Sequence, residues 1–454
     1  MAERLVVIGG DAGGMAAASQ ARKLRPDLDI VVLEMGRWTS YSACGIPYVV
    51  GGEVDDIEDL VARSPQEFRD RYGMDVRLGH EAVGIDLDRG EVEFRDHAEG
   101  RTSRVGFDQL MLGMGARPRR PDLPGIDHPC VLGVQTLGDA ADLLGHAEHI
   151  GASEVVVVGA GYIGLEMAEA FLRRGAKVTV VERDAEVMRT LDADMGALVR
   201  EAMVGHGIDV RCGVATTGFS DGKVHTDDGD VAADLVVLGL GVVPNGELAA
   251  DAGIALGAAG AVAVDRRQRT TAEGVWAAGD CCESYHLVTT RKVHVALGTV
   301  ANKQSRVAGI NIGGGYATFP GVVGTAVTKV CDTEVARTGL SEREAERDGF
   351  GCHAVTIEST TRAGYFPGAS PLTVKMLAER TSGRLLGAQI VGQEGAAKRI
   401  DVVATALHAR MTVEEMTHLD LSYAPPFSPV WDPVLVAARK ATEAVIAGAA
   451  GGGG

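Results

Sequence analysis

The sequence predicts an α/β fold in which one βαβ unit occurs twice and a region with a different pattern follows. Each unit contains a short β-branched run, a glycine-rich turn, an alanine-rich helix, a second β-branched run and a closing glutamate. The two copies read LVVIGGDAGGMAAASQARKLRPDLDIVVLE and EVVVVGAGYIGLEMAEAFLRRGAKVTVVE. From about residue 322 the pattern shifts to alternating runs such as HAVTIEST and LTVKMLAE, which favour a separate α+β domain.

The second copy contains the complete G-x-G-x-x-G spacing of a dinucleotide-binding turn. Its glycines are Gly159, Gly161 and Gly164, and Glu182 ends the second strand about 20 residues further on. The glycines permit a tight turn, so a pyrophosphate can meet the backbone amides at the helix N-terminus. The terminal carboxylate can accept hydrogen bonds from ribose hydroxyls, so we expect a dinucleotide to bind here.

The first copy departs from this spacing at one position. It has Gly9, Gly13 and Gly14 in the turn and Glu34 at the end of the second strand, but Asp11 stands where the second glycine is expected. A side chain at this position could crowd the phosphates of a ligand. The remaining glycines and the closing acid still predict a second dinucleotide site.

Composition and charge exclude several classes of function. Hydrophobic residues make up 46% of the chain and charged residues 23%, which is typical of soluble globular proteins. The formal net charge of −18 argues against nucleic acid and anionic membranes as partners, because both are bound through basic patches. No apolar run reaches the roughly 18 residues of a membrane span, and no targeting segment is expected. The seven cysteines lack the paired spacing of a disulfide framework or a zinc site, so we expect a cytoplasmic protein with no metal.

Three further segments, LMLGMGARPRRPDLPG, VVLGLGVVPN and GVWAAGDCCE, make the pattern more specific. Together with the two βαβ units they resemble the two-dinucleotide-binding-domain flavoproteins, the pyridine nucleotide-disulfide oxidoreductases, from about residue 4 to 445. The resemblance implies two Rossmann-like domains in a glutathione reductase-like arrangement and a C-terminal dimerisation domain. The implied boundaries are 1–112 and 246–320 for a discontinuous FAD-binding domain, 113–245 for an NAD(P)H-binding domain, 322–445 for the dimerisation domain and 446–454 for a flexible tail.

The resemblance also implies roles for individual residues. The first turn and its closing glutamate would contact the diphosphate and adenosine ribose of FAD, and Asp280 would bind the flavin side chain. A helix beginning near Leu297 to Ala301 would place its N-terminus by the flavin, where partial positive charge stabilises the anionic reduced ring. The second turn would hold the diphosphate of NADH or NADPH. Tyr162 resembles the family's aromatic gate over the flavin, and Glu166 resembles its nicotinamide anchor.

The segment VVERDAEV at the end of the second unit bears on the choice of nucleotide. Glu182 favours the free 2′- and 3′-hydroxyls of NADH and repels a 2′-phosphate, whereas Arg183 could pair with that phosphate. We therefore expect a preference for NADH with measurable use of NADPH.

The stretch WTSYSACGIPYVV contains a single cysteine, Cys44. In two-cysteine reductases of the family the partners are spaced C-x-x-x-x-C, but Thr39 and Val49 occupy the corresponding positions. The stretch resembles the S-x-x-C active site of coenzyme A-disulfide reductases and the related NADH oxidases and persulfide reductases, with Ser40 or Ser42 before the cysteine. The second thiol would then come from the substrate, and Cys44 would cycle through a mixed disulfide. Because thiolate is the nucleophile, we expect the pKa of Cys44 to be depressed.

Other functions for this cysteine stay open at this point. In an NADH oxidase or peroxidase it would cycle through sulfenic acid, and in a persulfide reductase it would carry a persulfide. A flavin-bearing redox sensor with little turnover is a further alternative. A free cysteine can also be a buried packing residue.

Recognition of coenzyme A would need cations, because coenzyme A carries several phosphate charges. Arg22, Lys23 and Arg25 lie at the end of the first helix, and the resemblance places basic residues for coenzyme A near here, with Arg22 the first choice. The alternative is a solvated helix end, where cations interact favourably with the helix dipole in any case.

The resemblance implies a homodimer in which the partner subunit lends tyrosines to the active site. Two segments match, AGYFPGASPLTVK with Tyr365 and LSYAPPFSPVWDP with Tyr423, although Phe427 replaces a tyrosine often found in the second. Either tyrosine could instead pack at the dimer seam. The expected substrate is a small-molecule disulfide or thiol, and which tyrosine assists catalysis is open.

Overall fold

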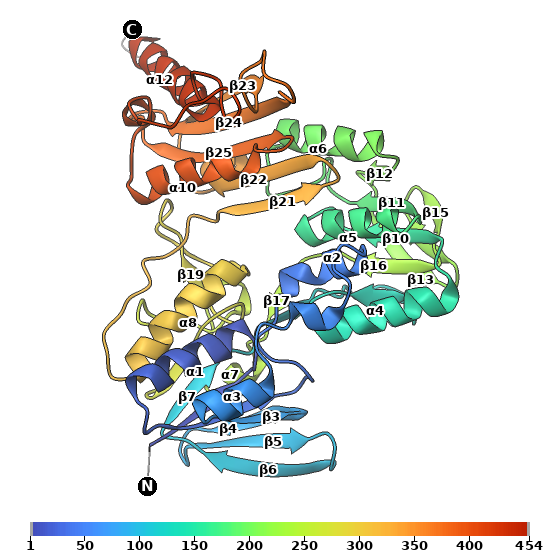
Figure 1. The fold of residues 1–454 in the computed structure, drawn as a ribbon, viewed down its shortest axis with the longest axis vertical. Coiled ribbons are helices and arrows are strands. Elements are labelled where there is room, and N and C mark those ends of the chain that lie inside the picture. Colours follow the sequence, from blue (N-terminus) through green and yellow to red (C-terminus); the bar gives the residue numbers. More distant parts are fainter. Residues whose placement is uncertain (1–2, 452–454) are drawn as a thin grey trace.

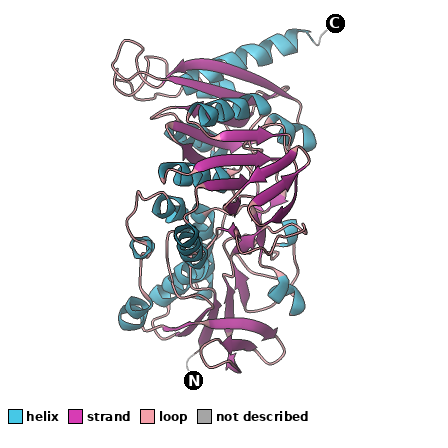
Figure 2. Ribbon diagram, turned by 90° about the vertical axis from the view of Figure 1, so that its right-hand side faces the viewer, coloured by secondary structure: helices cyan, strands magenta, loops and turns pink. Residues whose placement is uncertain are grey.

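The computed structural model describes residues 3–451, and its largest sheets are three five-stranded sheets, one in each of three regions. In Figure 1 the first region lies at the bottom in blue and yellow, the second lies to the right in green, and the third lies at the top in orange and red. Figure 2 shows the strands of these regions stacked along the long axis with helices beside them. This arrangement confirms the predicted α/β fold with a C-terminal α+β domain.

The first sheet is parallel throughout, and its strands carry almost continuous β-branched and leucine residues because both faces are covered. In spatial order the strands are β18 (Val275–Ala277), β7 (Gln109–Leu112), β1 (Arg4–Ile8), β2 (Asp29–Glu34) and β3 (Asp75–Leu78). One face packs against α1 (Ala12–Leu24), α3 (Pro65–Tyr72) and α8 (Gly298–Ile312). The other face packs against a small antiparallel sheet of β4 (His80–Asp86), β5 (Glu91–Asp96) and β6 (Arg101–Gly106).

Two helices of this domain that are far apart in sequence, α1 and α8, lie side by side (Figure 1). Small side chains along α1, which reads AGGMAAASQARKL, let the two backbones approach closely. A Cβ added to Gly309 of α8 would come within 2.4 Å of the carbonyl oxygen of Ala17 in α1. The glycine therefore fixes the spacing of the helix pair, along which a cavity lies.

The second sheet is also parallel and repeats the βαβ order of the first. In spatial order its strands are β12 (Asp209–Cys212), β11 (Lys177–Glu182), β10 (Glu154–Val158), β16 (Leu235–Leu238) and β9 (Val131–Gly133). Its helices are α4 (Leu137–Ile150), α5 (Tyr162–Arg173) and α6 (Ala193–Gly205). A three-stranded antiparallel sheet adds β13 (Thr216–Ser220), β14 (Lys223–Thr226) and β15 (Gly229–Ala232), and the chain enters and leaves through the pair β8 (Ala116–Pro118) and β17 (Val242–Pro244).

The third sheet is antiparallel, as the alternating pattern of its sequence predicts. In spatial order its strands are β21 (Ala326–Val330), β22 (Thr333–Gly339), β25 (Leu385–Gly392), β24 (Pro371–Glu379) and β23 (Cys352–Thr360). Its helices are α9 (Glu342–Arg347), α10 (Ile400–His408), α11 (Val413–Met416) and α12 (Pro433–Gly451). The remaining short elements of the chain are η1 (Ala43–Gly45), α2 (Ile46–Val50), η2 (Ile57–Leu60), α7 (Glu247–Asp251), η3 (Ala258–Gly260), β19 (Ser284–Tyr285), β20 (Lys292–Val293) and η4 (Ala397–Arg399).

The C-terminal helix differs from its sequence-based expectation. A flexible tail is predicted from residue 446, but α12 continues to Gly451. The run VIAGAAG is rich in alanine, which has the highest helix propensity, so the last turns continue the helix. Residues 452–454 of the predicted tail lie outside the described residues.

Candidate active site

The turn between β1 and α1 leaves no room for side chains at two of its glycines. Gly9 has φ +102°, and a Cβ there would lie 2.2 Å from the carbonyl oxygen of Gly113. A Cβ on Gly14 would lie 1.9 Å from the carbonyl oxygen of Gly9, whereas the nearest atom to a Cβ on Gly13 is 3.2 Å away. The turn therefore exposes backbone rather than side chains at the N-terminus of α1, which suits the diphosphate of FAD.

Two acidic side chains fix the geometry of this turn. The carboxylate of Glu34 accepts hydrogen bonds from the amides of Gly10 and Gly36, each at 2.6 Å. Burial raises the pKa of Glu34, although both amides act in the opposite direction. The carboxylate of Asp11 accepts a hydrogen bond from the amide of Tyr41 at 3.0 Å, and burial raises its pKa to about 6. The side chain of Asp11, at the position of the expected glycine, therefore binds the loop that carries Cys44, which is called the cysteine loop below.

The loop that carries Cys44 is tied to the same turn. The amide of Ser40 donates to the carbonyl of Gly10 at 2.9 Å, and Ser40 has φ +48°, a strained conformation for a residue with a side chain. Ser42 precedes η1, and its carbonyl accepts a hydrogen bond from the amide of Gly45 at 2.8 Å. Cys44 lies within η1 and is exposed.

The electrostatic surroundings of Cys44 differ from the expectation. Desolvation raises the pKa of its thiol, and the carboxylates of Glu166, Asp280 and Asp11 raise it further. A depressed pKa was expected, but the protein groups that act on the thiol here are mainly acidic. The same pattern shows that the structure gathers Cys44, Glu166 and Asp280 within electrostatic range, from three distant parts of the sequence.

Asp280 and the start of α8 lie together at the carboxyl ends of the first sheet. Burial raises the pKa of Asp280, whose backbone carbonyl accepts a hydrogen bond from Nε2 of His294 at 2.8 Å. Leu297 is the N-cap of α8, and the amide of Ala301 donates to the carbonyl of Leu297 at 3.0 Å. The helix therefore begins at the residue where the sequence predicts a helix N-terminus.

Gln304 of α8 is a supporting residue that sequence reasoning missed. It is fully buried, its Oε1 accepts from the amide of Gly279 at 3.1 Å, and its Nε2 donates to Oγ of Ser284 at 2.9 Å. It therefore binds α8 to the segment that carries Asp280. A glutamine within a helix gives no sequence signal for such a role, because the contact depends on the tertiary packing of α8.

The second nucleotide turn repeats the geometry of the first. A Cβ on Gly159 would lie 2.7 Å from the carbonyl oxygen of Gly239, and a Cβ on Gly164 would lie 2.0 Å from the carbonyl oxygen of Gly159. Gly161 is the N-cap of α5, and the nearest protein atom to a Cβ there is 3.9 Å away. The space at Gly161 is therefore open for a ligand rather than filled by protein.

Glu182 occupies the place in this domain that Glu34 occupies in the first. Its carboxylate accepts hydrogen bonds from the amide of Ala160 at 2.7 Å and from the amide of Asp184 at 2.8 Å. Arg183 is exposed, and its nearest acidic partner is Asp184 at 4.0 Å. The arginine is therefore free to turn toward a bound nucleotide.

Tyr162 and Glu166 lie on successive turns of α5. The hydroxyl of Tyr162 accepts a hydrogen bond from Oγ1 of Thr190 at 3.5 Å. Oε1 of Glu166 accepts a hydrogen bond from Oγ1 of Thr328 in β21 at 2.7 Å, and burial raises the pKa of Glu166. The third domain therefore packs onto the helix that carries both residues.

A cavity of about 410 Å³ lies along α1 and α8 and reaches the cysteine loop at Ser40. Its lining residues are Ala12, Met15, Ala16, Ser19, Gln20, Lys23, Ser40, Arg63, Phe68, Asn302, Lys303 and Arg306. Four of them are cations, in a chain whose net charge is −18. The cavity is therefore suited to an anionic ligand.

Arg22, the expected first choice for an anionic substrate, does not line this cavity. Its guanidinium donates to the backbone carbonyl of Pro26 at 2.7 Å and to that of Gly73 at 3.1 Å. Arg25 pairs with Asp27 and Glu3 on the surface. Of the three basic residues at the end of α1, Lys23 is the one that faces the cavity.

Tyr365 and Tyr423 come together from two loops of the third domain. Both side chains are exposed, and the pKa of Tyr423 is raised by desolvation and by a hydrogen bond with Tyr365. The mostly buried Arg399 joins the two loops, because its Nη2 donates to the carbonyls of Thr361 at 2.6 Å and Phe427 at 2.8 Å. The tyrosines are distant from Cys44 in sequence and are presented on the surface of the domain.

Residues 3–451 contain neither a side-chain cluster suited to a metal ion nor a helix suited to a membrane span. That range holds no group of three or more histidine, cysteine or acidic side chains arranged for a metal ion. None of its helices is both long and apolar enough to cross a membrane. All seven cysteines are free thiols.

The chain matches known families and proteins along almost its whole length. The family model described as pyridine nucleotide-disulphide oxidoreductase matches residues 3–305, and the model for the dimerisation domain of that family matches residues 325–433. The chain is 38% identical over 442 residues to the NAD(P)H sulfur oxidoreductase (CoA-dependent) of Pyrococcus furiosus, covering 96% of this chain and 98% of that protein. It is 29% identical to the coenzyme A disulfide reductase of Staphylococcus epidermidis, covering 94% and 96%.

Solved structures show the same fold. The NAD-dependent persulfide reductase from A. fulgidus is 38% identical with a TM-score of 0.94, covering 97% of this chain and 83% of that chain. Reduced CoADR-RHD of Bacillus anthracis is 32% identical with a TM-score of 0.95, covering 98% and 81%. The chain therefore belongs to the pyridine nucleotide-disulphide oxidoreductase family, as an enzyme that binds FAD and a nicotinamide nucleotide.

Proposed function

We propose that the enzyme uses NADH to reduce a low-molecular-weight disulfide, with coenzyme A disulfide as the preferred substrate, through Cys44 alone. The observation that carries this proposal is the cationic cavity beside the cysteine loop. Lys23, Arg63, Lys303 and Arg306 supply positive charge where the diphosphate and 3′-phosphate of coenzyme A would need it. In a chain with a net charge of −18, such a cluster is a specific feature rather than a general surface property.

The position and size of the cavity support the same ligand. Its volume of about 410 Å³ falls within the usual range of small-molecule sites. Ser40 lines the cavity and lies four residues before Cys44. The phosphates would bind between α1 and α8, and the pantetheine arm would run past Ser40 so that its sulfur meets the exposed thiol.

The chemistry needs one protein thiol and one thiol from the substrate. The Cys44 thiol first gives up its proton. The resulting thiolate attacks one sulfur of the disulfide RSSR, forms the Cys44–S–S–R bond and releases RS⁻, which takes up that proton. Two electrons and one proton then convert the mixed disulfide into the Cys44 thiolate and a second RSH. When bound, FAD would supply these electrons, which it would take from NADH as hydride. The turns at Gly9 and Gly159 would hold the two nucleotides.

We further propose a homodimer with composite sites. An exposed patch on the third domain contains Tyr365, Tyr423, Phe427, Val430 and Trp431. Large apolar and aromatic side chains are costly to leave in water, so a patch of this kind favours burial against another protein. A second copy seated on this patch would bring its tyrosines to the Cys44 site, where a hydroxyl could donate a hydrogen bond to the departing thiolate.

A second candidate function uses the same thiol with a different acceptor. A relative 34% identical over 451 residues, from Methanocaldococcus jannaschii, is named NADH oxidase. The exposed side chain of Cys44 would be accessible to oxygen or peroxide and could cycle through sulfenic acid. The cationic cavity has no role in that reaction, which is why we favour the disulfide.

An acceptor panel tests the proposal. Steady-state oxidation of NADH by the FAD-loaded enzyme would be measured with coenzyme A disulfide, polysulfide, oxygen and hydrogen peroxide. We expect the highest kcat/KM with coenzyme A disulfide. Cys44→Ser should lose disulfide turnover by on the order of a thousandfold, while single-turnover reduction of its flavin by NADH continues. A higher kcat/KM with oxygen or peroxide would assign the oxidase function instead.

A further inference from the structure

The segment from Arg183 to Asp192 connects β11 to α6 and lies beside the second nucleotide turn. The amide of Met188 donates to the carbonyl of Ala160 at 2.8 Å, so the segment is bound to the turn itself. Met188 is buried and has φ +53°, a strained backbone that persists only where surrounding contacts enforce it. The contacts to this segment include hydrogen bonds from side chains of the third domain.

We propose that the third domain holds this segment and thereby positions Tyr162 for the nicotinamide nucleotide, with Arg337 as the central positioning residue. This positioning affects only the nucleotide side of the reaction. It does not depend on which acceptor the enzyme reduces.

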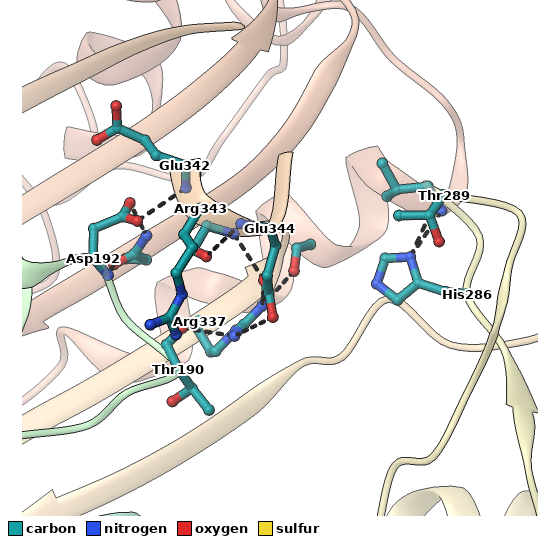
Figure 3. Close-up of polar contacts among 12 residues, drawn as sticks. Thr190, Asp192, His286, Thr289, Arg337, Glu342, Arg343 and Glu344 are labelled. Atoms are coloured by element: carbon teal, nitrogen blue, oxygen red, sulfur yellow. Dashed lines mark hydrogen bonds and ion pairs between the residues drawn. The ribbon is translucent and has the colours of Figure 1, made fainter. Parts of the chain in front are cut away.

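The first contact is made by Arg337 of β22 (Figure 3), and its side chain is largely buried. Its Nη1 donates to the backbone carbonyl of Thr190 at 2.6 Å, and its Nη2 donates to the carbonyl of Gly339 at 2.6 Å and to Glu344 at 2.7 Å. Burial alone would raise the pKa of Glu344, but the charge and hydrogen bonds of Arg337 lower it overall. The guanidinium is thus fixed on both sides, and Thr190 is fixed with it.

The second contact is a buried cluster around Asp192, the N-cap of α6. The amide of Asp192 donates to Oε1 of Gln389 at 2.8 Å, and Nε2 of Gln389 donates back to Oδ2 of Asp192 at 2.6 Å. The amide of Glu342 donates to Oδ1 of Asp192 at 2.9 Å, and the buried Lys375 lies 3.4 Å from Oδ2. Unpaired groups in such a cluster are costly, so the end of the segment is firmly held.

A third contact lies between these two. Nη2 of Arg343 donates to the backbone carbonyl of Arg189 at 2.5 Å, and Figure 3 shows Arg343 beside Glu342 and Glu344 at the start of α9. Three residues of the segment, Arg189, Thr190 and Asp192, are therefore bound by side chains of the third domain. Each of these bonds joins residues that are about 150 or more positions apart in the chain.

Tyr162 connects the held segment to the nucleotide site. Its hydroxyl accepts from Oγ1 of Thr190, the residue whose carbonyl Arg337 binds. Tyr162 is the first residue of α5 and follows the open space at Gly161 directly. A shift of Thr190 would therefore change both the position of the Tyr162 ring and the floor of the turn at Ala160, and both would weaken nucleotide binding.

Equilibrium titration of the oxidised holoenzyme with NAD⁺ tests this coupling, because NAD⁺ binds without hydride transfer and without a disulfide. The variants are Arg337→Met, Arg337→Lys and Gln389→Met. The control is Arg291→Met. It removes the ion pair between Arg291 and Asp348, whose charged atoms lie 2.7 Å apart at the end of α9. The KM for NADH and the KM for the acceptor are measured in parallel.

We expect Arg337→Met and Gln389→Met to raise the Kd for NAD⁺ and the KM for NADH by about tenfold, with the acceptor KM unchanged. Arg337→Lys should give an intermediate value, because an ammonium keeps the charge but lacks the fork that reaches Thr190, Gly339 and Glu344 together. Arg291→Met should leave the Kd for NAD⁺ unchanged. If Arg337→Met yields no holoenzyme, Arg337→Lys and Gln389→Met decide the question. A wild-type Kd in both of these, or an equal rise in Arg291→Met, would overturn the proposal.

Discussion

At the residue scale, Glu34 and Glu182 make the same hydrogen bonds in the two nucleotide domains. Each carboxylate accepts two backbone amides, one from the glycine-rich turn and one from the residue two positions after the glutamate. The strand end is thereby fixed against the turn, and the carboxylate is oriented before any ribose arrives. Selectivity at Glu182 then depends on its charge, which repels a 2′-phosphate.

Removal of this charge should change the nucleotide preference. The unmodified enzyme should have a higher kcat/KM for NADH than for NADPH. Glu182→Ala should lower the ratio of these two kcat/KM values by about five- to thirtyfold, the equivalent of about 1–2 kcal/mol. Glu182→Gln should reduce the preference for NADH in the same way, because it also removes the charge while it keeps an acceptor for one of the two amides. A preference for NADPH in the unmodified enzyme would mean that Arg183 governs the choice.

His286 gives the fold a defined acid sensitivity. Its ring is buried, and Nδ1 accepts hydrogen bonds from the amides of Val288 and Thr289, each at 3.3 Å (Figure 3). Burial lowers its pKa from 6.5 to about 4. Between pH 6.5 and pH 4 the histidine is therefore protonated in the unfolded chain but mostly neutral in the folded chain. The free energy of unfolding present at pH 7 is consequently reduced as the pH falls through this window.

The loss from this one histidine should approach about 3 kcal/mol at pH 4. His286→Asn keeps an acceptor for the two amides but does not titrate. The thermal midpoint of the wild-type holoenzyme should therefore fall more steeply between pH 7 and pH 5 than that of the variant. If the thermal midpoints of the two proteins fall equally between pH 7 and pH 5, His286 does not contribute to the acid sensitivity.

At the scale of elements, the helix pair of α1 and α8 decides which cations meet a substrate. The sequence indicates a basic helix end, but residues 22 and 23 point about 100° apart on a helix, and only the packing of α8 shows which one faces the cavity. That packing joins segments nearly 300 residues apart, so no local pattern reveals it. For the same reason the sequence did not reveal Arg63, Lys303 or Arg306.

Lys23→Ala should raise the KM for coenzyme A disulfide by about tenfold at low salt. The effect should be smaller at high salt, because mobile ions screen the attraction between Lys23 and the phosphates of the substrate. The value of kcat should change little, because Lys23 binds a part of the substrate remote from the reacting sulfur. Arg25→Ala is the control, since Arg25 lies at the same helix end but pairs with Asp27 and Glu3. Equal effects of the two variants would show that general charge, rather than the cavity, attracts the substrate.

At the scale of the whole molecule, the sequence predicts the elements well and their mutual contacts poorly. The repeated βαβ units and the change of pattern near residue 322 depend on local periodicity, which is readable without a structure. Contacts such as Arg337 with Thr190 or Thr328 with Glu166 join separate domains. The reason for Asp11 was also hidden, because its partner, the amide of Tyr41, lies on the cysteine loop.

Composite sites between two subunits predict complementation. A heterodimer of a Cys44→Ser subunit and a Tyr365→Phe/Tyr423→Phe subunit would have one site with both defects and one intact site. Its activity should therefore be about half that of the wild type, although each homodimer is impaired. If the heterodimer is no more active than the Tyr365→Phe/Tyr423→Phe homodimer, the tyrosines act within their own subunit or not at all.

The central claim is that Cys44 works alone and takes its second sulfur from the substrate, and the mass of the protein after half a turnover tests it most directly. Holoenzyme with Cys44 as the free thiol and FAD oxidised, and with no NADH present, would be mixed anaerobically with one equivalent of coenzyme A disulfide per FAD. The reaction would be quenched with acid and analysed by intact and peptide mass spectrometry. The account predicts that one coenzyme A thiol is released per subunit and that the other half is attached to Cys44, with no adduct in Cys44→Ser. An unmodified Cys44 in an enzyme that has consumed the disulfide, or an adduct on another cysteine, would contradict it.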